Sequence, residues 1–325
     1  MPAPASRLKR TLVRAGWPGP LAAWIILYIT FTVLAPDTFA TLDTLQTMIR
    51  QTTMVGIAAL GMTMVIVLGG IDLSVGSTVA FTTVVIAALL QAGASPIVAA
   101  AGGVAFAGLC GLVIGLLITL LGVTPFIVTL GAMGIIRGAA KGLAHEQKID
   151  APMSWLNDLV ADLPSDSRWM ILPPGVWALL LMALAIGGLL RYTRFGRHVF
   201  AIGSNELTAR LSGVRVGMVK VSVYALASAL SGLAGLMQFS RLTVGDPTVA
   251  QGLELDVIAA VVIGGGALSG GEGSVPGSLV GALLMTLIRS GCTHLGISNW
   301  VQEIITGLII VTAVVLDRLR HRRAA

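Results

Sequence analysis

One aspartate in an otherwise apolar part of the sequence is the first residue whose chemistry needs an explanation. Asp72 lies in the segment Gly69-Gly70-Ile71-Asp72-Leu73-Ser74-Val75-Gly76. A buried carboxylate is costly unless it is paired or hydrated. Either Asp72 or Ser74 can cap the helix that follows, by accepting a hydrogen bond from its free N–H groups, while the glycines allow a tight turn. The segment therefore predicts a break between two helices in which Asp72 has a structural role, and a hinge or pathway role stays open beside it.

A second glycine-rich break lies near the end of the chain, from Gly264 and Gly265 to Ser274. When 55–70 is aligned with 250–265, Gly69 and Gly70 match Gly264 and Gly265, and the segments that follow match after a two-residue insertion. Broken helices at matching positions are typical of transporters built from repeats. The sequence thus indicates a weak internal repeat, although chance similarity between glycine-rich segments is an alternative.

Residue patterns for enzymatic chemistry are missing from the sequence. The glycine-rich segments lack the Gly-Lys-Ser/Thr string of a phosphate-binding loop, so the chain itself is not expected to hydrolyse ATP. The only cysteines, Cys110 and Cys292, form no metal-binding or redox pattern. No catalytic residue, cofactor or metal is therefore predicted. The four histidines lie in or near loops or the tail, where solvated or structural roles are expected: His145, His198, His294 and His321.

The composition places all these residues in a membrane protein. Apolar residues make up 55% of the chain and charged residues 11%, with a mean hydropathy of +0.90. A bilayer core about 30 Å thick needs a helix of about 20 apolar residues. Long continuous apolar runs are typical of helices and not of barrel strands, which alternate. We expect an all-α polytopic membrane protein with about ten transmembrane helices and Gly-rich broken or re-entrant segments. The expected spans are 18–35, 52–70, 73–92, 96–121, 123–141, 172–190, 218–240, 256–268, 275–291 and 299–316.

Basic residues predict the orientation of these spans. Fourteen of the 21 lysines and arginines lie before the first span, in or beside the loop 191–217, or after the last span. With ten spans these segments share one face, and the positive-inside rule makes that face cytoplasmic. The net charge of +6 is thus an effect of topology and lipid contact, and no nucleic-acid partner is expected.

The expected organisation has three parts. A cytoplasmic tail, 1–17, precedes a transmembrane domain, 18–316, and a second cytoplasmic tail, 317–325, closes the chain. The domain carries a cytoplasmic loop at 191–217 and an acidic periplasmic loop at 142–171. An alternative makes the N-terminal region a signal peptide, but no small-x-small cleavage site follows the first apolar run.

The cytoplasmic loop predicts a short helix at about 204–213. Ser204 or Asn205 can cap its start, Glu206 stands in its first turn, and Gly213 can end it. Two ladders of glycines at every fourth position, starting at Gly134 and Gly273, allow close helix approach, either within the chain or between subunits.

Four strings in order resemble the permease subunits of bacterial sugar importers of the ATP-binding cassette class, the ribose and other monosaccharide type. The similarity runs from about residue 45 to 316. Its most specific strings are Gly69-Gly70-Ile71-Asp72-Leu73-Ser74-Val75-Gly76, Thr124-Pro125-Phe126-Ile127-Val128-Thr129-Leu130, Arg194-Phe195-Gly196 with Ala201-Ile202-Gly203-x-Asn205, and Glu254-Leu255-Asp256-x-Ile258-Ala259-Ala260-Val261-Val262-Ile263-Gly264-Gly265.

This resemblance implies a non-enzymatic, homodimeric pore in the bacterial inner membrane with both termini in the cytoplasm. It implies two further partners, a cytosolic ATP-binding cassette ATPase, which binds the ATP, and a periplasmic sugar-binding protein. It also makes the 204–213 helix the coupling helix, with Asn205, Ala209 and Gly213 at matching positions and Thr208 in place of the usual alanine. The four-residue spacing of Ala209 and Gly213 predicts that both face the ATPase groove.

Two alternatives stay open. The chain could be a permease of the same superfamily for branched-chain amino acids or nucleosides, since the sugar itself is not readable from the sequence. It could also be a membrane scaffold or an intramembrane enzyme, but the paired catalytic groups that such an enzyme needs inside its spans are missing from the sequence.

Overall fold

The computed structural model describes residues 18–162 and 170–322, with side chains as far as residue 315. The predicted N-terminal tail, the last three residues, and Asp166 and Arg168 of the acidic loop lie outside this description. The described residues form twelve α-helices: α2 (Pro18–Leu34), α3 (Leu42–Val67), α4 (Val75–Gln91), α5 (Pro96–Leu121), α6 (Pro125–Leu143), α7 (Pro174–Tyr192), α8 (Arg194–Ser204), α9 (Glu206–Leu211), α10 (Val216–Leu242), α11 (Leu253–Ile263), α12 (Val275–His294) and α13 (Asn299–Arg322).

The other regular elements are small. A 3₁₀-helix, η1 (Trp155–Asp158), lies in the loop before α7. Two short strands, β1 (Ile149–Asp150) and β2 (Val244–Gly245), pair antiparallel with Ile149 opposite Gly245. Among the described residues, α3, α5, α6, α7, α10 and α12 are long and apolar enough to cross a membrane, and α2, α4 and α13 as far as Val315 are shorter apolar helices. The chain is thus an all-α polytopic membrane protein.

Each predicted span overlaps a helix, but two predicted lengths are wrong. Helix α3 begins at Leu42, ten residues before the predicted span 52–70, because Thr41 caps it there. Helix α5 has the predicted bounds, 96–121, because Ser95 caps its start and Gly122 ends it with a φ of 63°. The predicted span 256–268 is instead α11, which has 11 residues. A helix of that length rises about 16 Å. It covers about half of a bilayer core, so α11 does not cross as a continuous helix.

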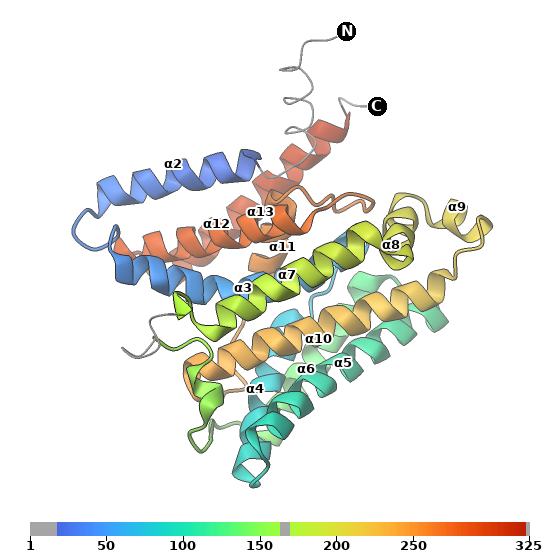
Figure 1. The fold of residues 1–325 in the computed structure, drawn as a ribbon. Helices are drawn as coiled ribbons and strands as arrows, with labels where there is room; N and C mark the ends of the chain where they lie inside the picture. Colours follow the sequence, from blue (N-terminus) through green and yellow to red (C-terminus); the bar gives the residue numbers. More distant parts are fainter. Residues whose placement is uncertain (1–17, 163–169, 323–325) are drawn as a thin grey trace.

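Helix α10 lies at the centre of the bundle, between α3 and α5. Figure 1 shows α3, α7 and α10 lying side by side, with α8 and α9 together at one end. Small residues permit this packing, because Gly61 of α3 meets the backbone of Ala227 and Gly115 of α5 meets the backbone of Val221. We call the end with α8 and α9 the α9 end, and the opposite end, where α10 finishes at Leu242, the far end.

The two glycine ladders have different surroundings. Gly277 and Gly281 of α12 pack against the backbone of Gly264 and Ala260, so the second ladder brings α11 and α12 together within the chain. A Cβ added at Gly134, Gly138 or Gly142 of α6 would meet nothing within 4 Å among the described residues. The first ladder therefore lies on an outer face of this chain.

Candidate functional site

The first helix break holds Asp72 in a buried turn between α3 and α4. The side chain is buried, at 1% exposure. Its Oδ1 accepts hydrogen bonds from the backbone N–H of Ser74, at 2.8 Å, and from the Ser74 hydroxyl, at 2.6 Å. Ser74 itself precedes the first residue of α4, and its side chain makes no capping hydrogen bond. Neither side chain caps α4 as expected, because no N–H group of the helix donates to the side chain of Asp72 or Ser74 in the part of the chain that the structure describes. Asp72 instead fixes the turn just before the helix by accepting from Ser74.

The remaining residues of this break lie against three other helices. Gly70 faces the hydroxyl of Tyr224 on α10, and Gly76 lies against the carbonyl of Ala250, just before α11. Thr129 of α6 donates a hydrogen bond to the carbonyl of Ile71, at 3.1 Å. Non-helical backbone at membrane depth is tolerated where protein surrounds it, and this packing provides those surroundings.

The second break repeats the local backbone geometry of the first. Gly69 has a φ of 87° and Gly265 a φ of 92°, values that glycine adopts without strain. Each donates its N–H three residues back along its helix, Gly69 to Ile66 at 2.9 Å and Gly265 to Val262 at 3.0 Å. Gly69 thus corresponds to Gly265, one residue away from the alignment made on the sequence.

The helices that follow the two breaks begin after Ser74 and Ser274. Ser74 is five positions beyond Gly69, whereas Ser274 is nine positions beyond Gly265. The second break is therefore longer by four residues, and not by the two residues that the sequence alignment indicated. Unlike Ser74, Ser274 accepts a hydrogen bond from the N–H of Gly277, at 3.2 Å.

Both breaks meet the α9 end at a cluster that we call the glycine junction, formed by Gly69, Gly203, Gly270 and Gly271. The backbone N–H of Gly271 donates to the carbonyl of Val67, at 2.9 Å. A Cβ on Gly203 of α8 would collide with that same carbonyl, and one on Gly270 would lie 2.7 Å from the carbonyl of Gly203. The junction thus connects α3, α8 and the α11–α12 loop through backbone contacts. Sequence reasoning missed it, because its members are far apart in the chain.

The predicted cytoplasmic helix is present but shorter than expected, since α9 is Glu206–Leu211. Asn205 caps it, with its Oδ1 accepting from the N–H of Thr208 at 2.8 Å. Gly213, with a φ of 84°, lies in the turn that follows α9. Asn205 and Gly213 thus have the predicted cap and end positions.

Glu206 ties α9 to α10. Its carboxylate accepts hydrogen bonds from the ammonium group of Lys220, at 2.8 Å, and from the guanidinium group of Arg210, at 3.2 Å. The hydrogen bond from Lys220 is the main reason why the pKa of Glu206 lies below its ordinary value of 4.5. Burial opposes this shift, and Arg210 adds to it.

The predicted orientation of Ala209 is wrong. Ala209 is 4% exposed and belongs to the apolar core, so its methyl group faces the protein. Gly213 lies beyond the end of α9, so the four-residue spacing does not place it on the same helix face. The outward residues are Leu207 and Leu211, which are 68% and 81% exposed. These two leucines are four residues apart and so form the apolar outer face of α9.

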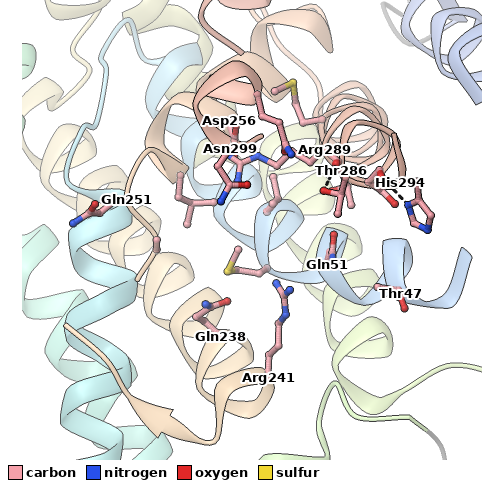
Figure 2. A pocket seen from close by; sticks show the side chains of 18 residues that line it. Thr47, Gln51, Gln238, Arg241, Gln251, Asp256, Thr286, Arg289, His294 and Asn299 are labelled. Atoms are coloured by element: carbon pink, nitrogen blue, oxygen red, sulfur yellow. Dashed lines mark hydrogen bonds and ion pairs between the residues drawn. The ribbon is translucent and has the colours of Figure 1, made fainter. Parts of the chain in front are cut away.

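A polar cavity of about 460 Å³ lies at the far end of the bundle. Figure 2 shows its walls, with Gln51 on α3, Gln238 on α10, Asp256 on α11 and Arg289 on α12. Arg289 and Asp256 form an ion pair in which the guanidinium Nη2 and the carboxylate Oδ2 are 2.6 Å apart. The volume of the cavity falls within the roughly 300–1,000 Å³ that is typical of small-molecule sites.

Sequence reasoning quoted Asp256 only within a family string and did not single out Gln238. The sequence did carry a signal for both residues, because amide and charged side chains inside apolar helices are rare and often functional. None of the predicted break residues, Gly69 to Gly76 or Gly264 and Gly265, lines this cavity. The break residues and the cavity are thus separate features of the same bundle.

The helices, the buried breaks and the polar cavity define a multi-pass membrane permease. Comparison with known proteins agrees. The family model described as the permease component of a branched-chain amino acid transport system matches residues 44–314. The chain therefore belongs to this family of permease components of ATP-binding cassette transporters, and it is not itself an enzyme.

Several relatives are similar to this chain over nearly their whole lengths. The ribose import permease protein RbsC of Escherichia coli (strain K12) is 36% identical over 301 residues, which cover 93% of both chains. The RbsC protein of Bacillus subtilis (strain 168) is 38% identical over 92% of both chains. The L-arabinose permease AraH of Azospirillum brasilense is 36% identical over 94% of this chain and 88% of its own. No solved structure matches.

Proposed function

We propose that this chain forms the membrane pathway of an ATP-driven importer that takes up a monosaccharide delivered by an external binding protein. The observation that carries this proposal is the similarity to ribose and L-arabinose permeases over more than nine-tenths of the chain. The family description names branched-chain amino acids. The individual relatives instead favour a sugar.

The proposed topology places the α9 end in the cytoplasm and the far end outside the cell. Arg191, Arg194, Arg197, Arg210 and Arg215 all lie at or beside the α9 end. Clusters of arginine and lysine next to spans favour the cytoplasmic side. Helix α11 and the segment 264–274 together count as one pass, because α10 ends at the far end and Gly271 bonds to Val67 at the α9 end. With the ten resulting passes, both termini are cytoplasmic, and the cavity of Figure 2 faces outward.

Energy coupling is proposed to occur through α9. The chain carries no nucleotide-binding motif, so the power stroke must come from the ATPase. Leu207 and Leu211 offer an exposed apolar face on a short helix that the ion pair of Glu206 with Lys220 fastens to α10. An amphipathic helix with such a face suits a groove on a partner protein. A second copy of this chain completes the proposed assembly.

Uptake by reconstituted vesicles tests the proposed substrate class. Vesicles would contain this permease with its cognate ATPase and binding protein, and would be given labelled D-ribose or L-arabinose. ATP-dependent accumulation that an excess of monosaccharide suppresses, and an excess of leucine or adenosine does not, would support sugar import. Suppression by leucine or adenosine alone would instead identify the alternative solute class.

Substitution of the outer leucines tests the coupling proposal. Leu207→Asp with Leu211→Asp should leave the permease inserted but weaken its binding to the ATPase by at least about tenfold, since burial of each leucine contributes roughly 1.5–3 kcal/mol. Met218→Asp is the matched control, because Met218 is also exposed, at 62%, but lies on α10. Pull-down and sugar-stimulated ATP hydrolysis would be measured together. Wild-type coupling in the double variant would show that the ATPase docks elsewhere.

A further inference from the structure

Two buried oxygen atoms in the cavity wall lack hydrogen-bond partners. They are Oδ1 of Asp256 and Oε1 of Gln238, and neither has a partner among the described residues. Asp256 is 1% exposed and Gln238 is 8% exposed. Leaving a buried acceptor unpaired costs about 1–3 kcal/mol. Both side chains line the cavity at the far end, so a molecule that enters it could donate to both oxygens.

The chemistry of the wall favours a ligand rich in hydroxyl groups, which both donate and accept hydrogen bonds. The ion pair with Arg289 balances the charge of Asp256 and leaves one carboxylate oxygen without a hydrogen bond, and Arg241 adds a second guanidinium group to the wall. Two unpaired acceptors select hydroxyl donors, and the half-exposed guanidinium group of Arg289 supplies a donor for oxygen atoms of the same ligand. Met54 and Met285 add apolar surface for the carbon face of such a molecule.

The position of the cavity agrees with a site met early on the pathway. Gln238 stands in the last two turns of α10, and Arg289 stands in the last two turns of α12, so both lie at the far end. Helix α11 connects Asp256 to the glycine junction through the segment that starts at Gly264. The cavity thus lies at the end of the bundle opposite α9, and α11 leads from its wall toward the glycine junction.

We propose that the cavity is a sugar-binding site of the pathway, in which Asp256 Oδ1 and Gln238 Oε1 accept hydrogen bonds from hydroxyl groups of the monosaccharide. This inference rests on the proposed function, since it assigns the residues that hold the imported sugar. The ion pair with Arg289 occupies Oδ2 of Asp256, so Oδ1 is the carboxylate oxygen left for the ligand.

The test uses the complete importer in vesicles, with the cognate ATPase and binding protein and with labelled D-ribose and L-arabinose as probes. Gln238→Leu and Asp256→Asn should each lower the maximal uptake rate at saturating loaded binding protein by about tenfold, the effect of losing one strong hydrogen bond. Stimulation of ATP hydrolysis by the loaded binding protein should stay near the wild-type rate, because docking on the outer face is unchanged. Thr52→Val is the matched control, since the buried Thr52 hydroxyl also donates to a helix carbonyl, that of Met48, but does not line the cavity.

A structural role would give a different result. If Asp256 only fastens α11 to α12 through the ion pair, Asp256→Arg combined with Arg289→Asp should restore uptake. If the Asp256 carboxylate binds the sugar, the double variant should stay inactive, because the carboxylate is then no longer on α11. Restored uptake in this double variant, or wild-type uptake in Gln238→Leu and Asp256→Asn, would overturn the assignment. If the wild-type importer instead accumulates neither sugar and its ATPase does not respond to loaded binding protein, the proposed function fails before the site is in question.

Discussion

At the scale of single residues, Asp72 fixes the turn before α4 by accepting hydrogen bonds from Ser74. We expect Asp72→Ala to lower the free energy of unfolding by about 1 kcal/mol, the usual effect of losing an intramolecular hydrogen bond, and by more where the Ser74 N–H stays buried without a partner. Asp72→Asn keeps an acceptor oxygen and should stay closer to the wild type. Thermal unfolding of the purified variants checks both, with sugar uptake measured in parallel. Wild-type stability and uptake in Asp72→Ala would show that the motif has no such role.

Glu206 makes the packing of α9 on α10 depend on pH. The pKa of Glu206 is lowered from 4.5 in the folded protein, mainly by the hydrogen bond from Lys220. The contribution of Glu206 to stability is therefore fully present above about pH 4.5, the pKa of Glu206 in the unfolded chain. This contribution is lost as the pH falls through the lower pKa of the folded protein. Hydrogen exchange of the α9 amides, followed from pH 7 to pH 3, should show this loss of protection.

The control for this pH dependence is Glu206→Gln, which removes the titrating group. Because the Glu206 side chain is 42% exposed, solvent screens the ion pair and the expected change at neutral pH is small. The variant should show weaker protection at pH 7 and no loss between pH 4.5 and pH 3. An unchanged acid loss of protection in Glu206→Gln would assign the effect to another group.

At the scale of elements, the glycine junction is where α8, α3 and the α11–α12 loop meet. Its contacts are between backbones, so we expect a movement of α8 to reach α3 and the α11–α12 loop without passing through flexible side chains. Gly203 lies on the same helix that leads into α9, and Gly271 bonds to the last residue of α3. The junction thus gives a rigid connection from α9 to both helix breaks.

Gly203→Ala should disturb this connection. The added methyl group would collide with the carbonyl of Val67, and backbone atoms cannot move aside as a side-chain end can. Overpacking of this kind costs about 1–3 kcal/mol. Gly188→Ala on α7 is the matched control, because it has no neighbour within 4 Å. The midpoint of thermal unfolding and the ratio of sugar imported to ATP hydrolysed should both fall in Gly203→Ala and not in Gly188→Ala. Equal values for the two variants would contradict the proposed role of the glycine junction in connecting α9 to the helix breaks.

At the scale of the whole molecule, the proposed topology predicts which segments a reporter enzyme can reach. Fusions that end at Gly217 or Ala325 should be active only with reporters that work in the cytoplasm, because the flanking arginines hold these segments inside. A fusion that ends at Met153, in the loop before η1, should be active only with a reporter that works outside the cell. The reverse pattern would invert the orientation and place the polar cavity on the cytoplasmic side.

The sequence by itself determined the class of the protein and most of its helices. Apolar runs, caps and glycines act over a few residues, so the bounds of α5 and the cap at Asn205 were predictable. Arginine clusters give an orientation without any tertiary contact. The end of α11 was indicated by the sequence, because the glycine-rich break that starts at Gly264 lies inside the expected span 256–268 and the helix ends just before it, at Ile263.

Only the tertiary structure decided which side of an element faces the protein. Ala209 and Leu211 are both apolar residues of the short helix α9, but packing on the neighbouring helices buries Ala209 and leaves Leu211 exposed. The cavity depends on the same kind of information. Gln238 and Asp256 become buried, unpaired acceptors only because α3, α10, α11 and α12 converge at the far end. Burial and hydrogen-bond satisfaction are set by contacts between distant parts of the chain, and local sequence carries no record of them.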